Sequence, residues 1–355
     1  MANRLFDLPE TKGKFEVQGL VNGVERERFY TATKTKTNKD FRIINFGCEY
    51  DEKKSIYIEL NGMPQNEVYF SKRNQDGKTE TKKIPWANRN TFDENGFRMI
   101  GVNVGIVKKL DENNKPVNDK KTMHAFDACN YIRDNLKDGA SVFVKGNLDF
   151  SSFTDKEGNV RRKIKQVPNQ ISLCKDVDFT AYDYIEKKPK HNFTQTILFK
   201  EIVQEVENEK ATGRFVVSAQ IVTWSDIVDA EFIITDSKLA NLFKKNLKPY
   251  NAIDVHGHIE TSQQVETVVE EDDWGEANEM ESTSVPFKTE MIITGAKGAS
   301  IDRETYNEKN VSEAINKIKN AQNAEKKFSG DVNNTNADEE VDWGEDEDDD
   351  DVPWE

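Results

Sequence analysis

The chain has 355 residues, 35% of them hydrophobic and 10% aromatic, which is enough for the cores of two or three modest domains and excludes a wholly disordered protein. The formal net charge of −15 hides an asymmetry: residues 1–190 hold 35 Lys+Arg against 28 Asp+Glu, whereas residues 331–355 hold 13 acids and no base. This distribution indicates a part that binds polyanions and an acidic tail that can compete for the same surface.

The location and the redox state follow from what the sequence lacks. No stretch approaches eighteen consecutive apolar residues, and the N-terminal residues lack the apolar centre of a signal peptide. We therefore expect a cytoplasmic protein, in host cytoplasm if a bacteriophage encodes it, since the Lys- and Asn-rich composition fits an AT-rich genome. Three widely spaced cysteines, Cys48, Cys129 and Cys174, predict reduced and mostly buried thiols rather than a disulfide framework.

The first half of the chain reads mainly as strands. Runs rich in β-branched and aromatic residues predict strands at 41–50, 56–60 and 97–107. The period then changes to that of a helix over 120–139, where Met123, Phe126, Ile132 and Leu136 share one face and Gly139 stops it. Strand patterns return at 141–150 and 161–173.

The second half repeats this order after a linker at 186–192. Strands are predicted at 193–206, 214–224 and 227–235, then a short amphipathic helix at 237–247 with Ser237 as a candidate N-cap. Two more strands follow, at 253–260 and 286–294. One phrase also recurs, VFVKGNLDF and IDVHGHIET, and its central glycine predicts a bulge or sharp bend in each strand.

Three strands, a helix and two strands is the element order of the OB-fold, a five-stranded barrel that binds oligonucleotides or oligosaccharides. We therefore predict a mainly β fold with two OB-fold-like five-stranded barrels, each with one helix between its third and fourth strands. The expected domains are a basic OB-fold domain at 1–185, an acidic OB-fold-like domain at 193–300, a helix or linker at 301–330 and a disordered acidic tail at 331–355.

Two segments resemble single-stranded DNA-binding proteins. Residues 139–173 look like the fourth strand, hairpin and fifth strand of that family, and Asp348, Asp349, Asp350, Asp351, Val352, Pro353 and Trp354 are similar to its acidic tail. Tails of the family end in Phe, whereas here Trp354 takes that place and Glu355 follows it. The resemblance implies a protein that coats and protects single-stranded DNA in replication, repair and recombination, and whose tail regulates binding and recruits partner proteins.

Single strands are held by a basic groove along the phosphates and by aromatic rings that stack on the bases. Three stretches, 25–42, 69–89 and 150–165, interleave rings with cations, although strand aromatics are more often core residues. If the chain is extended there, Phe29 and Tyr30 point to opposite faces and only one can stack. The predicted nucleic-acid-binding residues are Phe29, Tyr30, Lys34, Lys36, Lys39, Arg42, Tyr69, Phe70, Lys72, Arg73, Lys82, Lys83, Trp86, Arg89, Phe150, Phe153, Arg161, Arg162, Lys163 and Lys165.

The remaining part of the chain is more acidic, and it leaves a second interpretation open. Residues 191–330 hold 15 bases against 24 acids, so this half is expected to contact protein rather than nucleic acid, and Asp273-Trp274-Gly275-Glu276 recurs as Asp342-Trp343-Gly344-Glu345 in the tail. The alternative function is a replication or transcription accessory protein that binds other proteins, with a tail that mimics DNA. A structural assembly protein is a further alternative.

We expect no enzyme, no cofactor and no metal site. No phosphate-binding loop, nucleophile elbow or zinc-protease motif occurs, and the four histidines are scattered. His256 and His258 share one strand face, but no third ligand lies near them in sequence. The acid run of the tail cannot hold the fixed geometry that a catalytic metal pair needs.

Overall fold

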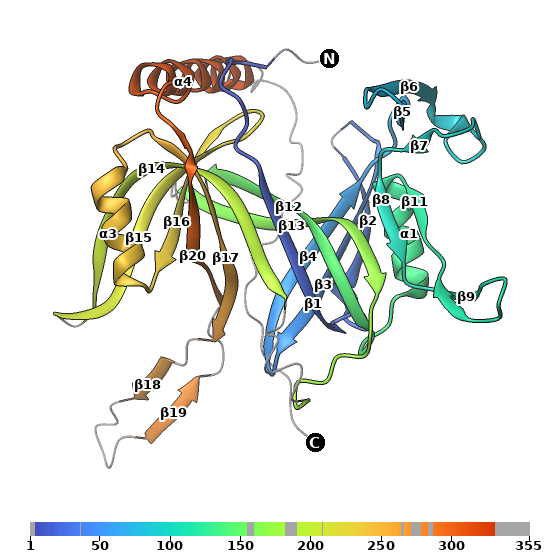
Figure 1. Cartoon of the computed structure of the whole chain (residues 1–355), viewed down its shortest axis with the longest axis horizontal. Helices are drawn as coiled ribbons and strands as arrows, with labels where there is room; N and C mark the ends of the chain where they lie inside the picture. Colours follow the sequence, from blue (N-terminus) through green and yellow to red (C-terminus); the bar gives the residue numbers. More distant parts are fainter. Residues whose placement is uncertain are drawn as a thin grey trace.

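The computed structural model describes residues 4–35, 37–154, 160–181, 190–207, 209–263, 266–270, 278–282 and 287–330. This described part confirms the mainly β fold: two groups of strands lie side by side, with three α-helices around them (Figure 1). The helices are α1 (Ala125–Asn135), α3 (Ser237–Asn246) and α4 (Glu308–Gly330), and the 3-10 turns are η1 (Glu27–Phe29) and η2 (Trp86–Asn88). None of these helices is long and apolar enough to cross a membrane.

The strands of the first half are β1 (Gly13–Asn22), β2 (Tyr30–Lys34), β3 (Asp40–Asp51), β4 (Lys54–Gly62), β5 (Glu67–Arg73), β6 (Thr79–Pro85), β7 (Arg98–Met99), β8 (Val102–Gly105), β9 (Lys108–Leu110), β10 (Pro116–Asn118), β11 (Lys121–Met123), β12 (Ser141–Thr154) and β13 (Val160–Leu173). Those of the second half are β14 (His191–Glu207), β15 (Lys210–Val222), β16 (Ile227–Ile234), β17 (Ala252–Gln263), β18 (Glu266–Glu270), β19 (Asn278–Ser282) and β20 (Phe287–Asp302).

Five strands of the first half pair in a ring. β1 pairs with β12 and with β3, β12 pairs with β13, and β3 pairs with β4, all antiparallel. A parallel contact between β13 and β4 completes the ring, but it consists of one residue pair, Gln166 with Ile58. The sheet is therefore not closed into a barrel by a continuous ladder of hydrogen bonds.

The second half repeats this pairing order. β14 pairs with β15 and β17, β15 pairs with β16, and β17 pairs with β20, again antiparallel. The parallel contact between β16 and β20 is also one residue pair, Ile233 with Ile292. In each half one helix precedes the fourth strand of the ring, α1 before β12 and α3 before β17.

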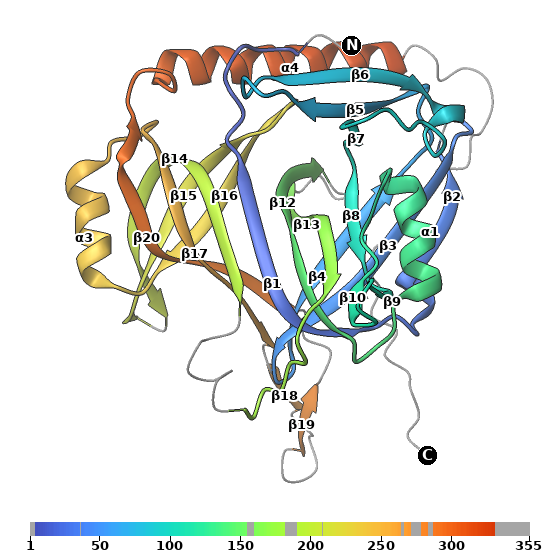
Figure 2. The ribbon, with the colours of Figure 1, turned by 45° about the vertical axis from the view of Figure 1, so that its right-hand side comes forward.

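β1 joins the two halves, and the sequence analysis missed it. It pairs antiparallel with β14 from Gly13 opposite Gln195 to Val17 opposite His191, so one sheet runs through both halves (Figure 2). Phe15 and Phe193 face each other in register and are 3% and 1% exposed, within a core that both halves share. The alternating burial along β1 was readable as the period-2 pattern of its sequence, GKFEVQGLVN.

α1 and α3 lie within the two predicted helices, but residues 121–123 of the first prediction, including Met123, form strand β11 instead. The side chain of His124 caps α1 by accepting from the Phe126 N–H at 3.2 Å. α3 begins at Ser237, but its N-cap is Asp236, whose Oδ1 accepts from the Lys238 N–H at 2.7 Å. Asp is as good a cap as Ser, so the sequence alone did not separate the two neighbours.

The predicted strand at 97–107 is wrong as a ring strand. It divides into β7, which pairs with β5 in a separate sheet of order β6-β5-β7, and β8, which pairs with β13 and β11. Residues 63–124 therefore form an insertion between β4 and α1. Figure 1 shows that β5, β6 and β7 lie on the α1 side of the molecule, away from the second half.

α4 packs its apolar side onto a second, smaller core. Val311, Ala314 and Ile318 are buried together with Phe6 and Leu8 from the N-terminal segment. Tyr306, just before the helix, donates its hydroxyl to the Pro9 carbonyl at 3.2 Å. α4 lies within the region 301–330 that the sequence predicted as a helix or linker, and it begins at Glu308.

Candidate nucleic-acid interface

The tip of the β12–β13 hairpin presents an exposed ring beside a cation. Phe153 on β12 is 54% exposed, and it lies directly opposite Arg161 on β13 in the antiparallel register. Phe150, three residues earlier, is 4% exposed and belongs to the core. Of the two rings predicted here, Phe153 is open to a base and Phe150 is not, because an odd step along a strand reverses the face.

Acids engage three further cations of this hairpin, Arg162, Lys163 and Lys165. Arg162 lies 3.6 Å from an Asp229 oxygen and 3.7 Å from a Glu231 oxygen, both on β16 of the second half. Lys163 lies 3.4 Å from Glu59. Ser152 donates its hydroxyl to Asp226 at 2.9 Å, which holds the hairpin against the turn before β16.

Glu59 sits between two of the predicted lysines. It accepts a hydrogen bond from Lys165, and its side chain is only 15% exposed. Burial alone would raise the pKa of the Glu59 carboxyl, but the hydrogen bonds and charges of Lys165 and Lys163 lower it below its usual value of 4.5. Glu59 is therefore ionised at neutral pH and offsets much of the positive charge of these lysines.

The sheet β5–β6–β7 carries a second exposed ring opposite a cation. Tyr69 on β5 is 37% exposed and pairs in register with Lys83 on β6, whose Nζ is 5.8 Å from the ring centroid. Phe70 points the other way, is 5% exposed, and contacts the Phe92 ring at 4.7 Å between centroids. Tyr69 is thus available for stacking, whereas Phe70 is a core residue.

The remaining cations of this sheet surround a ring that the sequence analysis did not select. The Nζ atoms of Lys82 and Lys72 lie 4.5 Å and 5.7 Å from the centroid of Phe97, which is half-buried. Lys82 also bonds to Glu94 at 2.5 Å. Arg73, at the end of β5, is exposed.

Trp86 is half-buried, and cations and rings cover it. The Arg89 guanidinium lies 3.9 Å from the indole centroid, while His124 and Phe126 meet the indole edge-on at 4.9 Å and 6.0 Å. Arg42 in turn stacks 3.6 Å over the Phe126 ring. Trp86 therefore forms part of a cation–ring stack at the start of α1 rather than an open platform.

Arg89 is fixed in this stack by a two-point ion pair. Its Nε and Nη2 donate to the two Asp127 oxygens at 2.7 Å and 3.0 Å. The hydrogen bonds that Arg89 donates to the Asp127 carboxylate raise the pKa of Arg89 further above its usual value. This pair orients Arg89 over Trp86 and satisfies most of its donors, since Nη1 also donates to the Trp86 carbonyl at 3.0 Å.

The predicted stretch at 25–42 offers fewer free rings and cations for nucleic-acid binding than the sequence predicted. Phe29 lies in η1 and is 5% exposed, so it belongs to the core. Tyr30 is half-buried and donates its hydroxyl to Asn130 at 2.8 Å, while Arg133 covers its ring at 4.6 Å. Lys34 lies 3.9 Å from Asp40, and Lys39 is exposed.

The structure therefore corrects three of the predicted stacking rings, Phe29, Phe70 and Phe150, which lie in the core and offer no face to a base. The other predicted residues divide into two surfaces, one around α1 and β5–β6–β7, the other on the β12–β13 hairpin against β16. Lys36, the tail residues Asp348 to Trp354, and the repeated phrases at 273–276 and 342–345 lie outside the described residues.

Metal ligands are not gathered in the part of the chain that the structure describes, where no group of three or more His, Cys, Asp or Glu side chains could hold an ion. His258 instead lies 3.0 Å from Glu260 on the same strand. The three cysteines are free, with Cys48 and Cys129 buried and Cys174 half-buried.

Comparison with known proteins places the chain in a family. Residues 78–331 match the YorF family, so the chain belongs to it. No curated protein matches the sequence. Among solved structures, the chain is similar to crystal structures of the single-stranded DNA binding protein from Thermus aquaticus. A deletion mutant gives 9% identity and a TM-score of 0.39 over 84% of this chain and 98% of that one. The wild-type protein gives 9% identity and a TM-score of 0.37, over 81% of this chain and 93% of that one.

Proposed function

We propose that the protein binds single-stranded DNA, coating it by phosphate contacts and by aromatic stacking. The observation that carries this proposal is the same arrangement in two separate hairpins: an exposed ring directly opposite a cation, Phe153 with Arg161 and Tyr69 with Lys83. Solvent-exposed rings flanked by cations are what stacking on unpaired bases requires. In a duplex the bases are stacked on one another, so they present no free face on which such rings could stack.

In this proposal each half is an OB-fold-like unit, whose ring of five strands is completed by a single residue pair rather than by a continuous ladder. Support comes from the shared pairing order, in which the first strand pairs with the second and fourth, and the third touches the fifth in parallel. The domains would then be 1–185 and 193–300, followed by the helix region 301–330 and the tail 331–355. The tail would regulate binding and recruit replication or recombination proteins, as its acidic composition suits both roles.

The experiment is a titration of the full chain with fluorescent oligo(dT), with duplex DNA as competitor. Phe153→Ala and Tyr69→Ala should each weaken binding by about 1–3 kcal/mol. Phe153→Trp should keep the wild-type affinity, because the indole also has a face that can stack on a base. Leu242→Ala is the matched control, since Leu242 is 55% exposed on α3 and has no ring. Equal affinity of wild type, Phe153→Ala and Tyr69→Ala would contradict the stacking site.

A second candidate is an accessory protein that binds other proteins, with a tail that mimics DNA. The observation that favours it is the neutralisation of the hairpin cations: Glu59 engages Lys163 and Lys165, and Asp229 and Glu231 engage Arg162. The same titration separates the two, because this candidate predicts no salt-sensitive preference for single strands over duplex.

A further inference from the structure

The outer face of the seam between the two halves carries a row of polar side chains that crosses four strands and ends at a glycine on a fifth. Lys14 on β1 lies in register with Asn147 on β12 and with Thr194 on β14. Thr194 lies in register with His256 on β17, which lies opposite Gly295 on β20. At the usual strand spacing of about 4.8 Å, the four polar side chains extend roughly 14 Å across the sheet.

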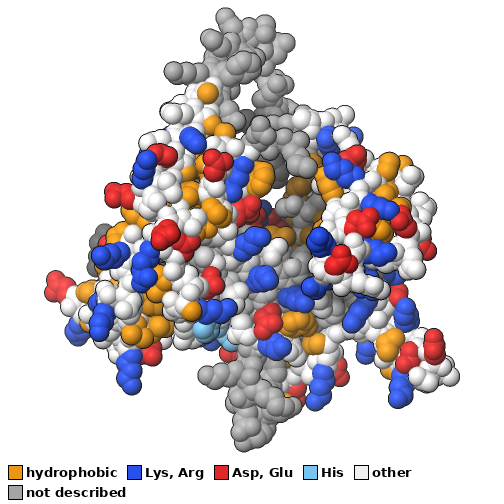
Figure 3. Space-filling model, turned by 45° about the horizontal axis from the view of Figure 1, so that its top comes forward, with side chains coloured by type: hydrophobic (Ala, Val, Ile, Leu, Met, Phe, Trp, Pro, Cys, Tyr) orange, Lys and Arg blue, Asp and Glu red, His pale blue; other side chains and the backbone are white. Residues whose placement is uncertain are grey.

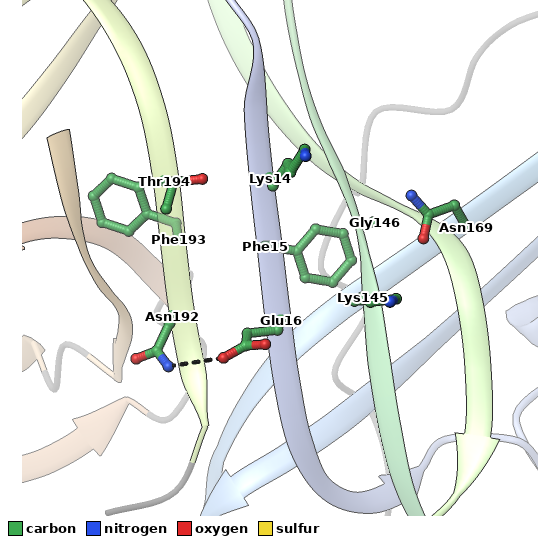
Figure 4. Close-up of a pocket in the computed structure, with 9 residues that line it drawn as sticks. All are labelled: Lys14, Phe15, Glu16, Lys145, Gly146, Asn169, Asn192, Phe193 and Thr194. Carbon is green, nitrogen blue, oxygen red and sulfur yellow. Dashed lines mark hydrogen bonds between the residues drawn. The ribbon is translucent and has the colours of Figure 1, made fainter. Parts of the chain in front are cut away.

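Two adjoining hollows follow this row. The larger, of about 430 Å³, lies between β1, β12, β13 and β14 and includes Lys14, Lys145, Asn169 and Thr194 (Figure 4). The smaller, of about 170 Å³, shares Lys14 and Thr194 and continues over β17 and β20 to Lys297. Together they form one groove that begins in the first half and ends in the second.

The groove is positively charged, and its lysines are not neutralised. Lys12, Lys14, Lys145 and Lys297 are exposed, and none of the four forms an ion pair with an acid in the part of the chain that the structure describes. This distinguishes them from Arg162, Lys163 and Lys165 of the hairpin, which acids already engage. Figure 3 shows several Lys and Arg side chains in the central part of this face, between the two halves.

The two acids that line the groove accept hydrogen bonds from neutral side chains rather than from its lysines. Glu16 accepts from Asn192 at 3.2 Å, and Asp254 accepts from the Thr196 hydroxyl at 2.6 Å. Four lysines against two acids leave the groove with a net positive charge. Among the described residues that line it, the groove offers no phenylalanine, tyrosine or tryptophan face to a base, because its two phenylalanines, Phe15 and Phe193, are core residues at 3% and 1% exposure.

We propose that this groove, lined by Lys12, Lys14, Lys145 and Lys297, binds the phosphodiester backbone of a single DNA strand as it passes from the first half to the second. The inference rests on the proposed function and deepens it. Phosphates are its ligand because the groove is cationic and has no exposed phenylalanine, tyrosine or tryptophan among its described lining residues, so it holds the backbone of any sequence. The second half then takes part in nucleic-acid binding despite its acidic composition.

The test compares two triple variants of the full chain. The groove variant is Lys14→Gln, Lys145→Gln and Lys297→Gln. The control is Lys238→Gln, Lys317→Gln and Lys319→Gln, which removes the same charge from exposed positions on α3 and α4. Binding of oligo(dT) is measured across a salt series, because each single-strand phosphate contact contributes about 0.7 to the slope of log K against log salt.

The groove variant should lose about 2 units of this slope, and the control should keep the wild-type slope. If both variants keep the wild-type salt slope while wild type binds single strands, the groove proposal is wrong and the proposed function stands. If wild type itself does not bind oligo(dT), the proposed function fails and the groove proposal falls with it. Thermal melts of both variants should match wild type, since all six lysines are exposed.

Discussion

Gly146 and Gly257 occupy equivalent positions in the fourth strands of the two rings. Each lies at a register shift, between Lys145 and Gly146 in β12 and between His256 and Gly257 in β17. A Cβ on Gly146 would lie 2.0 Å from the Val167 carbonyl oxygen, and one on Gly257 would lie 1.8 Å from that of Ile292. The neighbouring backbone therefore leaves no room for a side chain at either bulge.

Alanine at these glycines should destabilise the fold. Because backbone rather than a flexible side chain blocks the Cβ, Gly146→Ala or Gly257→Ala should lower the free energy of unfolding by about 1–3 kcal/mol. Urea unfolding followed by circular dichroism measures this. Gly298→Ala on β20 is the control, because nothing lies within 4 Å of its Cβ position. An unchanged midpoint for Gly257→Ala would mean that the bulge relaxes freely.

These glycines show what the sequence could predict. Each bulge was predicted from a glycine within a run of alternating residues. Hydrophobic periodicity placed α1, α3 and most ring strands, because burial of one face of a helix or strand makes apolar residues recur at the spacing of that element. β1 was missed although its alternation is equally regular, and without it the join between the halves and the lysine groove could not be predicted. The run at 97–107, predicted as the third strand, belongs instead to the insertion at 63–124. Chain order alone does not reveal which strands pair.

The candidate site was less predictable than the fold. Strand periodicity assigns two faces but does not say which faces the core, so Phe70 and Phe150 were selected together with Tyr69 and Phe153. The ion pairs of Arg162 with Asp229 and Glu231 join residues far apart in sequence. Such pairings arise from tertiary packing, and no local pattern encodes them.

Glu59 should make stability depend on pH. Its pKa is lower in the folded state than in the unfolded one, so its contribution is present above about pH 4.5 and is lost as pH falls through the folded-state value. Glu59→Gln should cost roughly 1–2 kcal/mol at pH 7, because Lys165 and Lys163 lose a charged acceptor. The difference from wild type should shrink as pH falls below about 4.5, where the wild-type carboxyl is also neutral.

Urea unfolding at pH 7, 4 and 3 checks this pH dependence. The control is Glu67→Gln, whose partner Lys83 lies 3.7 Å away with both side chains 50% exposed, and which should change stability by less than about 1 kcal/mol. A Glu59→Gln deficit that is constant from pH 7 to pH 3 would show that packing, rather than charge, explains it.

Removing the acids that engage Arg162 should strengthen single-strand binding. In Asp229→Asn with Glu231→Gln, the guanidinium is freed for a phosphate, so the salt slope should rise by about 0.7. Lys200, which lies 3.2 Å from Asp229, is freed at the same time, and a phosphate contact from it adds about 0.7 more to the slope. The control, Glu201→Gln with Glu207→Gln, removes the same charge from exposed positions of β14. If both pairs of substitutions change the slope equally, the effect is one of net charge and the local release of Arg162 is disproved.

The acidic tail offers a test of competition for the basic surfaces. Residues 338–355 hold twelve acids and no base, so in the absence of DNA they can screen the exposed lysines electrostatically. Their deletion should raise affinity for oligo(dT) by on the order of tenfold near 10 mM salt, where the Debye length is about 30 Å, and much less near 150 mM, where it is about 8 Å. Trp354→Ala, which keeps every acid, should leave affinity unchanged at both salts if its role is to bind a partner protein. Equal affinities with and without the tail at low salt would exclude competition, because oppositely charged segments tethered in one chain attract most strongly when ions do not screen them.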